Sequence, residues 1–142
     1  HFPDGELAGE IHVEPVEELK ATPATRIIVR DPDASPDVFV ELANQLGMTG
    51  VTYFVGWSAW LDIAPRGVTK ASGLQEACDM LGIPANAVLA IGDGNNDIEM
   101  LRWAGRGVAV GDALEQVRAA ADAVTADFDD DGTAAELNRW FG

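Results

Sequence analysis

The stretch that decides the fold is VLAIGDGNNDIEML, residues 88–101. A short apolar run, residues 88–91, ends abruptly in a loop, residues 92–97, which contains two carboxylates and two amides. A helical pattern follows, with Ile98 and Leu101 apolar. This order predicts a buried strand with polar side chains at its carboxyl end, where open α/β sheets place their ligand sites.

The rest of the chain divides at residues 64–67, which contain a proline and a glycine. Before this boundary we expect a short helix near 16–20, a helix at 37–46, and strands at 26–29, 49–57 and 60–63, the last two forming a hairpin through 56–59. After it we expect helices at 68–81, 98–104, 113–121 and 133–141, and strands at 88–91, 107–110 and 123–125. Strands that alternate with helices favour a parallel sheet, so the sequence predicts an α/β fold.

Apolar side chains recur at helical spacing in two of these helices. In the helix at 37–46 the expected buried face consists of Val38, Leu42 and Leu46. In the helix at 68–81 it consists of Leu74, Ala77, Cys78 and Leu81. Cys78 is the single cysteine of the chain, which excludes an intrachain disulfide and suits a reducing cytoplasm.

Composition excludes several classes of protein. The 142 residues are 47% hydrophobic and 23% charged, as in ordinary globular domains. A formal charge of −15 argues against nucleic acid as a partner. No apolar stretch is long enough to cross a membrane and no secretory signal is visible, so we expect a cytoplasmic protein. The acidic residues at 127–131 are interpreted as solvated surface.

The loop at 92–97 carries the chemistry. Asp93 follows the predicted strand directly, Asp97 begins the next helix, and Asn96 offers an amide beside them. Two carboxylates at this position favour Mg²⁺, which binds through few protein ligands and completes its shell with water and phosphate. A glycine-rich turn with Asp97 as a helix cap is the simpler alternative. The complete stretch behind a buried strand favours the functional interpretation.

Lys70 begins the helix that precedes this strand. A cation is unfavourable at the positive end of a helix dipole, so its place there needs a reason. Its ammonium group is suited to neutralise a phosphoryl group beside a carboxylate. Taken alone, an ordinary surface lysine is the simpler interpretation. Together with the loop that contains Asp93, a phosphate-binding role is favoured.

These segments resemble the carboxyl-terminal part of a Cof-type phosphatase, a branch of the haloacid dehalogenase (HAD) superfamily. The resemblance is carried by residues 67–70, 90–101, 107–113, 121–125 and 130–132. Residues 26–63 are similar, with weaker motifs, to the second half of the α/β cap domain of that branch. The resemblance implies a partial substrate-specificity cap over residues 1–65. It implies the second half of a parallel, Rossmann-like catalytic core over residues 66–142.

The resemblance also implies a mechanism. In this family an aspartate attacks phosphorus to form an aspartyl-phosphate, and water then hydrolyses it. Lys70, Asp93 and Asp97 would be catalytic, with Lys70 and Asn96 binding phosphate and Asp93 binding Mg²⁺. Asp97 would be a further metal ligand or a supporting acid behind the metal. The implied substrate is a small phosphorylated metabolite.

The nucleophile motif of the family, Asp-x-Asp-Gly-Thr after an apolar strand, has no convincing match. Asp31 follows an apolar run, but the interval to Lys70 is too short for the expected core elements. Asp129 begins a matching DDDGT, but a poor strand precedes it and one short helix follows. We therefore expect a fragment, completed by an N-terminal segment or a second copy at the unpaired edge of the strand at 88–91.

Two other functions remain open. A truncated relative without a nucleophile would be a non-catalytic module that binds a metal, phosphate or a partner. P-type ATPases share a similar Gly-Asp-Gly-x-Asn-Asp loop, but they normally continue with Ala-Pro where this chain has Ile98 and Glu99.

Overall fold

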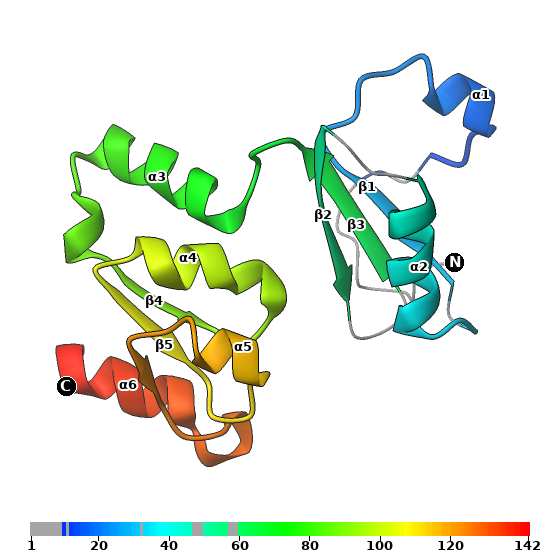
Figure 1. Cartoon of the computed structure of the whole chain (residues 1–142). Coiled ribbons are helices and arrows are strands. Elements are labelled where there is room, and N and C mark those ends of the chain that lie inside the picture. The colour runs from blue at the N-terminus through cyan, green and yellow to red at the C-terminus, as the bar shows by residue number, and fades with distance from the viewer. Residues whose placement is uncertain (1–9, 11, 32, 47–49, 57–59) are drawn as a thin grey trace.

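The computed structural model describes residue 10 and residues 12–31, 33–46, 50–56 and 60–142. These residues form two lobes joined by residues 66–69, and each lobe has its own sheet (Figure 1). A short helix, α1 (Val16–Leu19), precedes the first lobe. Both lobes combine helices with strands, which confirms the predicted α/β class.

The first lobe is an antiparallel sheet in the order β1-β3-β2, with helix α2 against one face (Figure 1). Val55 and Ile63 of the sheet pack around the buried side chains of Phe39 and Leu61. The opposite face carries Phe54 beside Asp62. The elements are β1 (Ile27–Arg30), α2 (Pro36–Leu46), β2 (Val51–Gly56) and β3 (Trp60–Pro65).

The predicted hairpin is confirmed by the antiparallel pairing of β2 with β3, in which Gly56 lies opposite Trp60. Its turn, residues 57–59, lies outside the described residues, as does Thr49 at the predicted start of the first strand. The second strand continues to Pro65, two residues beyond the prediction, because Ala64 and Pro65 still pair with β2.

The predicted buried face of α2 was wrong at Val38 and right at Leu42, while the burial of Leu46 lies outside what the structure describes. Phe39 is 3% exposed and Ala43 1% exposed, whereas Val38 is 52% exposed. Leu42 packs at the edge of the same cluster. The helix is turned by one position because Phe39 has the larger apolar side chain, and burying it against the sheet removes more surface from water.

The second lobe is a parallel sheet in the order β4-β5-β6. Helices α3, α4 and α5 lie on one side of it and α6 on the other (Figure 1). The strands are β4 (Leu89–Gly92), β5 (Arg106–Ala109) and β6 (Ala123–Val124). The helices are α3 (Lys70–Leu81), α4 (Ile98–Trp103), α5 (Glu115–Arg118) and α6 (Gly132–Phe141). Short 3₁₀ turns are η1 (Ala85–Ala87), η2 (Asn95–Asp97) and η3 (Phe128–Asp130).

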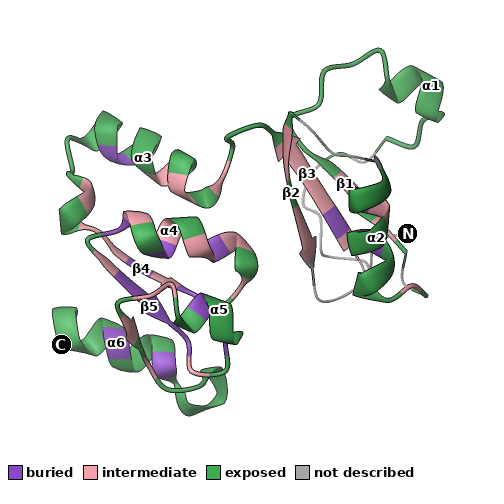
Figure 2. Ribbon diagram, viewed as in Figure 1, coloured by how far each residue is buried: buried purple, intermediate pink, exposed green. Residues whose placement is uncertain are grey.

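The core of this lobe lies between the sheet and helices α4 and α5 (Figure 2). Leu101 and Val117 are buried there against small strand residues such as Ala90 and Ala109. Gly107 permits the close approach of α4, because a Cβ atom at this position would lie 2.1 Å from the Leu101 carbonyl oxygen. The loop after β4 is therefore attached to a rigid layer.

Helix α3 begins at Lys70, later than predicted, because the preceding residue caps it. The Thr69 side chain accepts a hydrogen bond from the Ser72 amide, and the Ser72 side chain accepts one from the Thr69 amide. Cys78 is buried and Leu74 half-buried, as expected, but Ala77 is exposed and Leu81 is 71% exposed, so the prediction was wrong for these two residues. Helix α5 is likewise shorter than residues 113–121.

Candidate functional site

The site is built around the loop after β4. The strand ends at Gly92, turn η2 follows at Asn95, and α4 continues the chain without a break. Gly92 is required here, because a Cβ atom on it would lie 2.5 Å from the Cβ atom of Asp97. The loop thus folds back so tightly that the Asp97 side chain covers the end of the strand.

Asp97 lies at the centre of this loop and is 2% exposed. Its Oδ2 atom accepts hydrogen bonds from the backbone amides of Asp93, at 3.1 Å, and Gly94, at 3.0 Å. Its Oδ1 atom accepts a hydrogen bond from Lys70 Nζ. One carboxylate therefore closes the loop and ties it to the start of α3.

The ion pair with Asp97 explains the placement of Lys70. The side chain of Lys70 is 48% exposed, while that of its partner is 4% exposed. A buried carboxylate needs a cation or several hydrogen-bond donors, and Asp97 has both. The attraction offsets the unfavourable helix dipole and holds the ammonium group beside the loop.

Asp93 is exposed and lines a cavity of about 500 Å³ at the carboxyl ends of β4 and β5. Asp112 lines the same cavity, a residue to which the sequence analysis gave no role. The sequence did contain a signal for Asp112, because an apolar run ends in an apolar residue followed by Gly-Asp both at 91–93 and at 110–112. Parallel neighbouring strands bring the two carboxylates to one edge.

The carboxylate of Asp93 suits a Mg²⁺ site that has few protein ligands. In the part of the chain that the structure describes, no three His, Cys, Asp or Glu side chains gather as a metal cage. Mg²⁺ is commonly held by one or two carboxylates, with waters and substrate phosphate as its other ligands. The exposed carboxylate of Asp93 fits that pattern, whereas the Asp97 oxygens already accept three hydrogen bonds.

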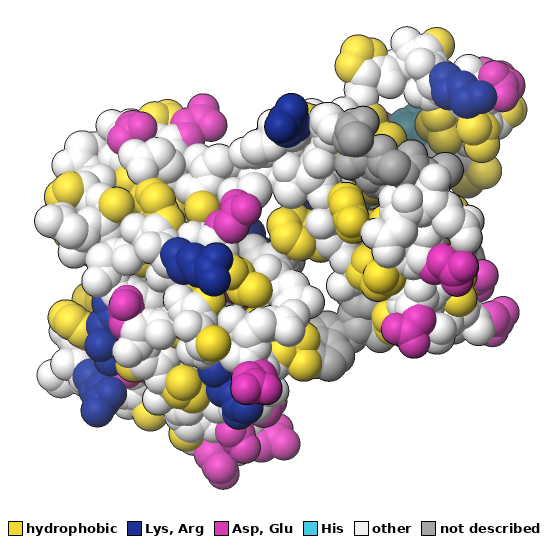
Figure 3. Space-filling model, viewed as in Figure 1, with side chains coloured by type: hydrophobic (Ala, Val, Ile, Leu, Met, Phe, Trp, Pro, Cys, Tyr) yellow, Lys and Arg dark blue, Asp and Glu magenta, His cyan; other side chains and the backbone are white. Residues whose placement is uncertain are grey.

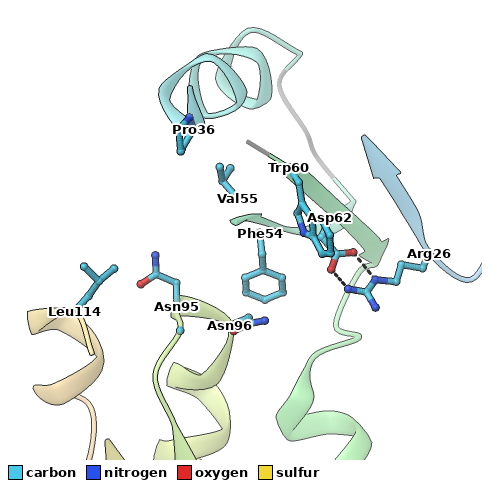
Figure 4. Close-up of a pocket in the computed structure, with 10 residues that line it drawn as sticks. Arg26, Pro36, Phe54, Val55, Trp60, Asp62, Asn95, Asn96 and Leu114 are labelled. Atoms are coloured by element: carbon cyan, nitrogen blue, oxygen red, sulfur yellow. Dashed lines mark hydrogen bonds and ion pairs between the residues drawn. The ribbon is translucent and has the colours of Figure 1, made fainter. Parts of the chain in front are cut away.

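Asn96 faces a different cavity from Asp93. It lines a cavity of about 270 Å³ between the lobes, together with Asn95 and Leu114 of the second lobe (Figure 4). Asn95 is held in place by Gln116 of α5, whose Nε2 atom donates to its Oδ1 atom at 2.8 Å. The structure thus joins Lys70 to Asp97, and it places Asn96 on the side of the loop that faces the first lobe.

The first lobe contributes an ion pair to the cavity between the lobes. Arg26 Nε donates to Asp62 Oδ1 at 2.7 Å, and a second guanidinium nitrogen pairs with Oδ2 (Figure 4). This hydrogen bonding raises the pKa of Arg26. The sequence analysis missed both residues, although a carboxylate within the apolar strand at 60–63 was a usable signal.

The two alternative nucleophiles lie in different lobes. Asp31 follows β1, in the antiparallel sheet of the first lobe. Asp129 is exposed within η3, and Thr125 to Asp127 separate it from β6. Neither carboxylate directly follows a strand of the sheet that positions Asp93.

Comparison with known proteins defines the family. The profile described as haloacid dehalogenase-like hydrolase matches residues 9–137. The chain therefore belongs to the haloacid dehalogenase-like hydrolases, which confirms the resemblance to Cof-type phosphatases noted from the sequence.

Individual relatives agree with this assignment. The 5-amino-6-(5-phospho-D-ribitylamino)uracil phosphatase YitU of Bacillus subtilis is 41% identical over 88 residues, 60% of this chain and 33% of the relative. A phosphoglycolate phosphatase of Natronomonas pharaonis is 38% identical over 113 residues, 77% of this chain and 46% of the relative. The solved structure of a HAD subclass IIB sugar phosphatase has 31% identity and a TM-score of 0.78, and the match covers 93% of this chain and 49% of that one. This chain thus spans half or less of these relatives.

None of the described helices combines the length and the apolar character needed to cross a bilayer. Acidic and basic side chains are scattered over the face shown in Figure 3, and a hollow separates the two lobes. The described Asp127, Asp129, Asp130 and Asp131 are exposed, as expected for a solvated acidic segment.

Proposed function

We propose that the protein containing this chain is a Mg²⁺-dependent phosphatase of small phosphorylated metabolites. Membership of a hydrolase family and the phosphatase names of its relatives support this proposal. The observation that carries it is the Lys70–Asp97 pair, which ties a cation to the loop that exposes Asp93. A cytoplasmic location remains a prediction.

In this proposal each residue of the loop has a separate task. The Lys70 ammonium group neutralises charge on a bound phosphoryl group, and Asn96 donates an amide hydrogen bond to phosphate or to the loop. Asp93 holds Mg²⁺, which when bound shields an attacking carboxylate from the negative phosphate. Asp97 holds Lys70 and the loop in place, and a direct bond from it to the metal is the alternative.

The proposed reaction passes through an aspartyl-phosphate, and we place its nucleophile outside these 142 residues. Among the described residues β4 pairs on one side alone, with β5. An unpaired strand edge is a site for strand addition. A complementary N-terminal segment carrying the nucleophile, or a second copy of this chain, would cover it.

The proposal is tested by phosphate release from p-nitrophenyl phosphate, catalysed by the intact protein. We expect activity to disappear with a chelator and to return with Mg²⁺. The variant Asp93→Asn should lose about 100-fold or more. Glu76→Gln, which changes an exposed carboxylate on α3 in the same way, should match the wild type. A wild-type rate for Asp93→Asn would contradict the role proposed for Asp93. Phosphate binding without turnover by the wild type would contradict the proposal as a whole and favour a non-catalytic module.

The location of the nucleophile has its own test. The 142-residue chain alone should show no turnover of p-nitrophenyl phosphate with Mg²⁺ present. Turnover that is abolished by Asp31→Asn or by Asp129→Asn would place the nucleophile inside the chain and overturn this part of the proposal.

A further inference from the structure

Asp112 supplies a second carboxylate to the cavity that contains Asp93. The two residues come from neighbouring segments, because β4 and β5 run parallel with Gly92 beside Ala109. The Val110 amide donates to the Gly92 carbonyl oxygen at 3.1 Å, which joins the segments just before each carboxylate. Two acidic side chains, 19 positions apart in the chain, therefore line one cavity of about 500 Å³.

The backbone on both sides of Asp112 is held in place. The Gly111 amide donates to the Ala126 carbonyl oxygen at 3.0 Å, and the Gly111 carbonyl oxygen accepts a hydrogen bond from Arg118 of α5 at 2.9 Å. Ala113 is 5% exposed and belongs to the core of the lobe. Asp112 itself is exposed, so a fixed segment presents its carboxylate at the cavity.

The contacts of the fold give the Asp112 carboxylate no structural task. Within the described ranges neither a hydrogen bond nor an ion pair involves this side chain. Helix α5 begins at Glu115, and its N-cap residue is Leu114, so Asp112 is not its cap. Asp97 differs in this respect, since it pairs with a lysine and closes the loop. The carboxylate of Asp112 is therefore available to a ligand.

The charge of the cavity favours a cation as that ligand. Apart from the two carboxylates, its described lining consists of the Thr133 hydroxyl group and of apolar and glycine residues. None of the described lining residues is a lysine, an arginine or a histidine. Two carboxylates that share a cavity repel each other, and a divalent cation between or beside them replaces that repulsion with attraction.

A second carboxylate has a defined use beside a Mg²⁺ ion. This ion keeps several of its waters when a protein binds it, because it dehydrates reluctantly. Protein groups that accept hydrogen bonds around a metal raise its affinity, and the loss of one typically costs about 10- to 100-fold. A carboxylate suits this position, since it accepts hydrogen bonds from water and its charge attracts the ion.

Resting on the proposed function, we infer that Asp112 is a positioning residue for Mg²⁺. Asp93 binds the ion directly, and the Asp112 carboxylate accepts hydrogen bonds from its water ligands. Asp112 thus sets the affinity for the metal and takes no part in the transfer of the phosphoryl group. Arg118 supports this role, because its hydrogen bond to Gly111 fixes the segment.

The test is a calorimetric titration of the intact protein with Mg²⁺ alone. Asp112→Asn keeps the size of the side chain and removes its charge, so the Kd for Mg²⁺ should rise about 10-fold. The Mg²⁺ concentration that gives half-maximal release of phosphate from p-nitrophenyl phosphate should rise in parallel. Most of the lost rate should return at saturating Mg²⁺, whereas Asp93→Asn should abolish measurable binding.

Two further variants separate this role from a general effect of charge or structure. Glu115→Gln removes the same charge at the start of α5, from an exposed residue outside the described lining of the cavity. It should leave the Kd for Mg²⁺ unchanged. Asp112→Glu retains the charge and should recover most of the affinity that Asp112→Asn loses.

The outcomes distinguish this inference from the proposed function. If Asp93→Asn weakens Mg²⁺ binding but Asp112→Asn binds as tightly as Glu115→Gln, the inference is overturned and the proposed function stands. A lower rate in Asp112→Asn that saturating Mg²⁺ does not restore, with an unchanged Kd, would overturn it as well. A wild-type protein that binds no Mg²⁺ would contradict the proposed function, and the inference would fail with it.

Discussion

Lys70 Nζ is hydrogen-bonded to Asp97 Oδ1, although the two residues lie 27 positions apart in the chain. Lys70 begins α3, and Asp97 ends the turn that follows β4. The carboxylate is buried and still has every oxygen bonded, since two backbone amides share its Oδ2 atom. Asp97 therefore supports the loop, the start of α3 and the ammonium group of Lys70 together.

Asp97→Ala should destabilise the protein by about 2 kcal/mol, because two backbone amides lose their acceptor in a partly buried loop. Urea unfolding of the 142-residue chain measures this change. Asp79→Ala, which removes an exposed carboxylate from the end of α3, should change the free energy of unfolding by less than about 0.5 kcal/mol. If both variants lowered the free energy of unfolding by the same amount, the buried hydrogen bonds of Asp97 would contribute no more to stability than an exposed carboxylate does.

Gly92→Ala should also destabilise the loop, by about 1–3 kcal/mol, because the added methyl group overlaps the Asp97 side chain. Gly73→Ala is the matched control, since the same methyl group on α3 meets no atom within 4 Å. It should stabilise the helix by about 0.5–1 kcal/mol. Thermal unfolding of both variants checks the pair, and a neutral Gly92→Ala would contradict the close approach.

Glu136 makes the stability of the second lobe depend on pH. Its carboxylate is 1% exposed and accepts hydrogen bonds from Arg106, Trp140 and Arg139. These bonds, with that from Arg106 the largest cause, lower its pKa from 4.5 to about 2. A depressed pKa in the folded state means that the stabilisation is complete above pH 4.5 and is lost as the pH falls towards 2.

Glu136→Gln should therefore lower the melting temperature at pH 7 and flatten its decline between pH 4.5 and 2. Calorimetry at several pH values in this window measures both effects. Glu76→Gln, on an exposed part of α3, should keep the pH dependence of the wild type. A Glu136→Gln curve parallel to the wild-type curve would show that other carboxylates control acid unfolding.

Thr69→Ala removes the side-chain acceptor that caps α3 and should cost about 1 kcal/mol. It should also loosen Lys70, the next residue, and so raise hydrogen exchange at the amides of the first helical turn. Thr69→Ser retains the hydroxyl group and should restore most of the protection. Equal exchange in both variants would rule out the cap as the feature that orders the start of α3.

Local sequence was sufficient to predict much of the second lobe. Strand β4, its polar loop and the start of α4 follow from an apolar run, two glycines and a helical period within 14 residues. The buried faces of α2 and α3 were harder to predict from the sequence. Helical spacing predicted that Val38 and Leu81 would be buried, but both are exposed. Burial depends on which neighbouring element packs against each helix, and spacing within the helix does not specify that neighbour.

The sequence by itself determined the α/β class, the alternating elements of the second lobe, and the loop with Asp93, Asn96 and Asp97. These features depend on residues close together in the chain, whose turn preferences and periodicity are readable one after another. Tertiary structure alone decided which distant groups meet. It paired Arg26 with Asp62 across 36 residues and Arg106 with Glu136 across 30. Such contacts depend on strand order and register, which bring residues together in space irrespective of their spacing in sequence.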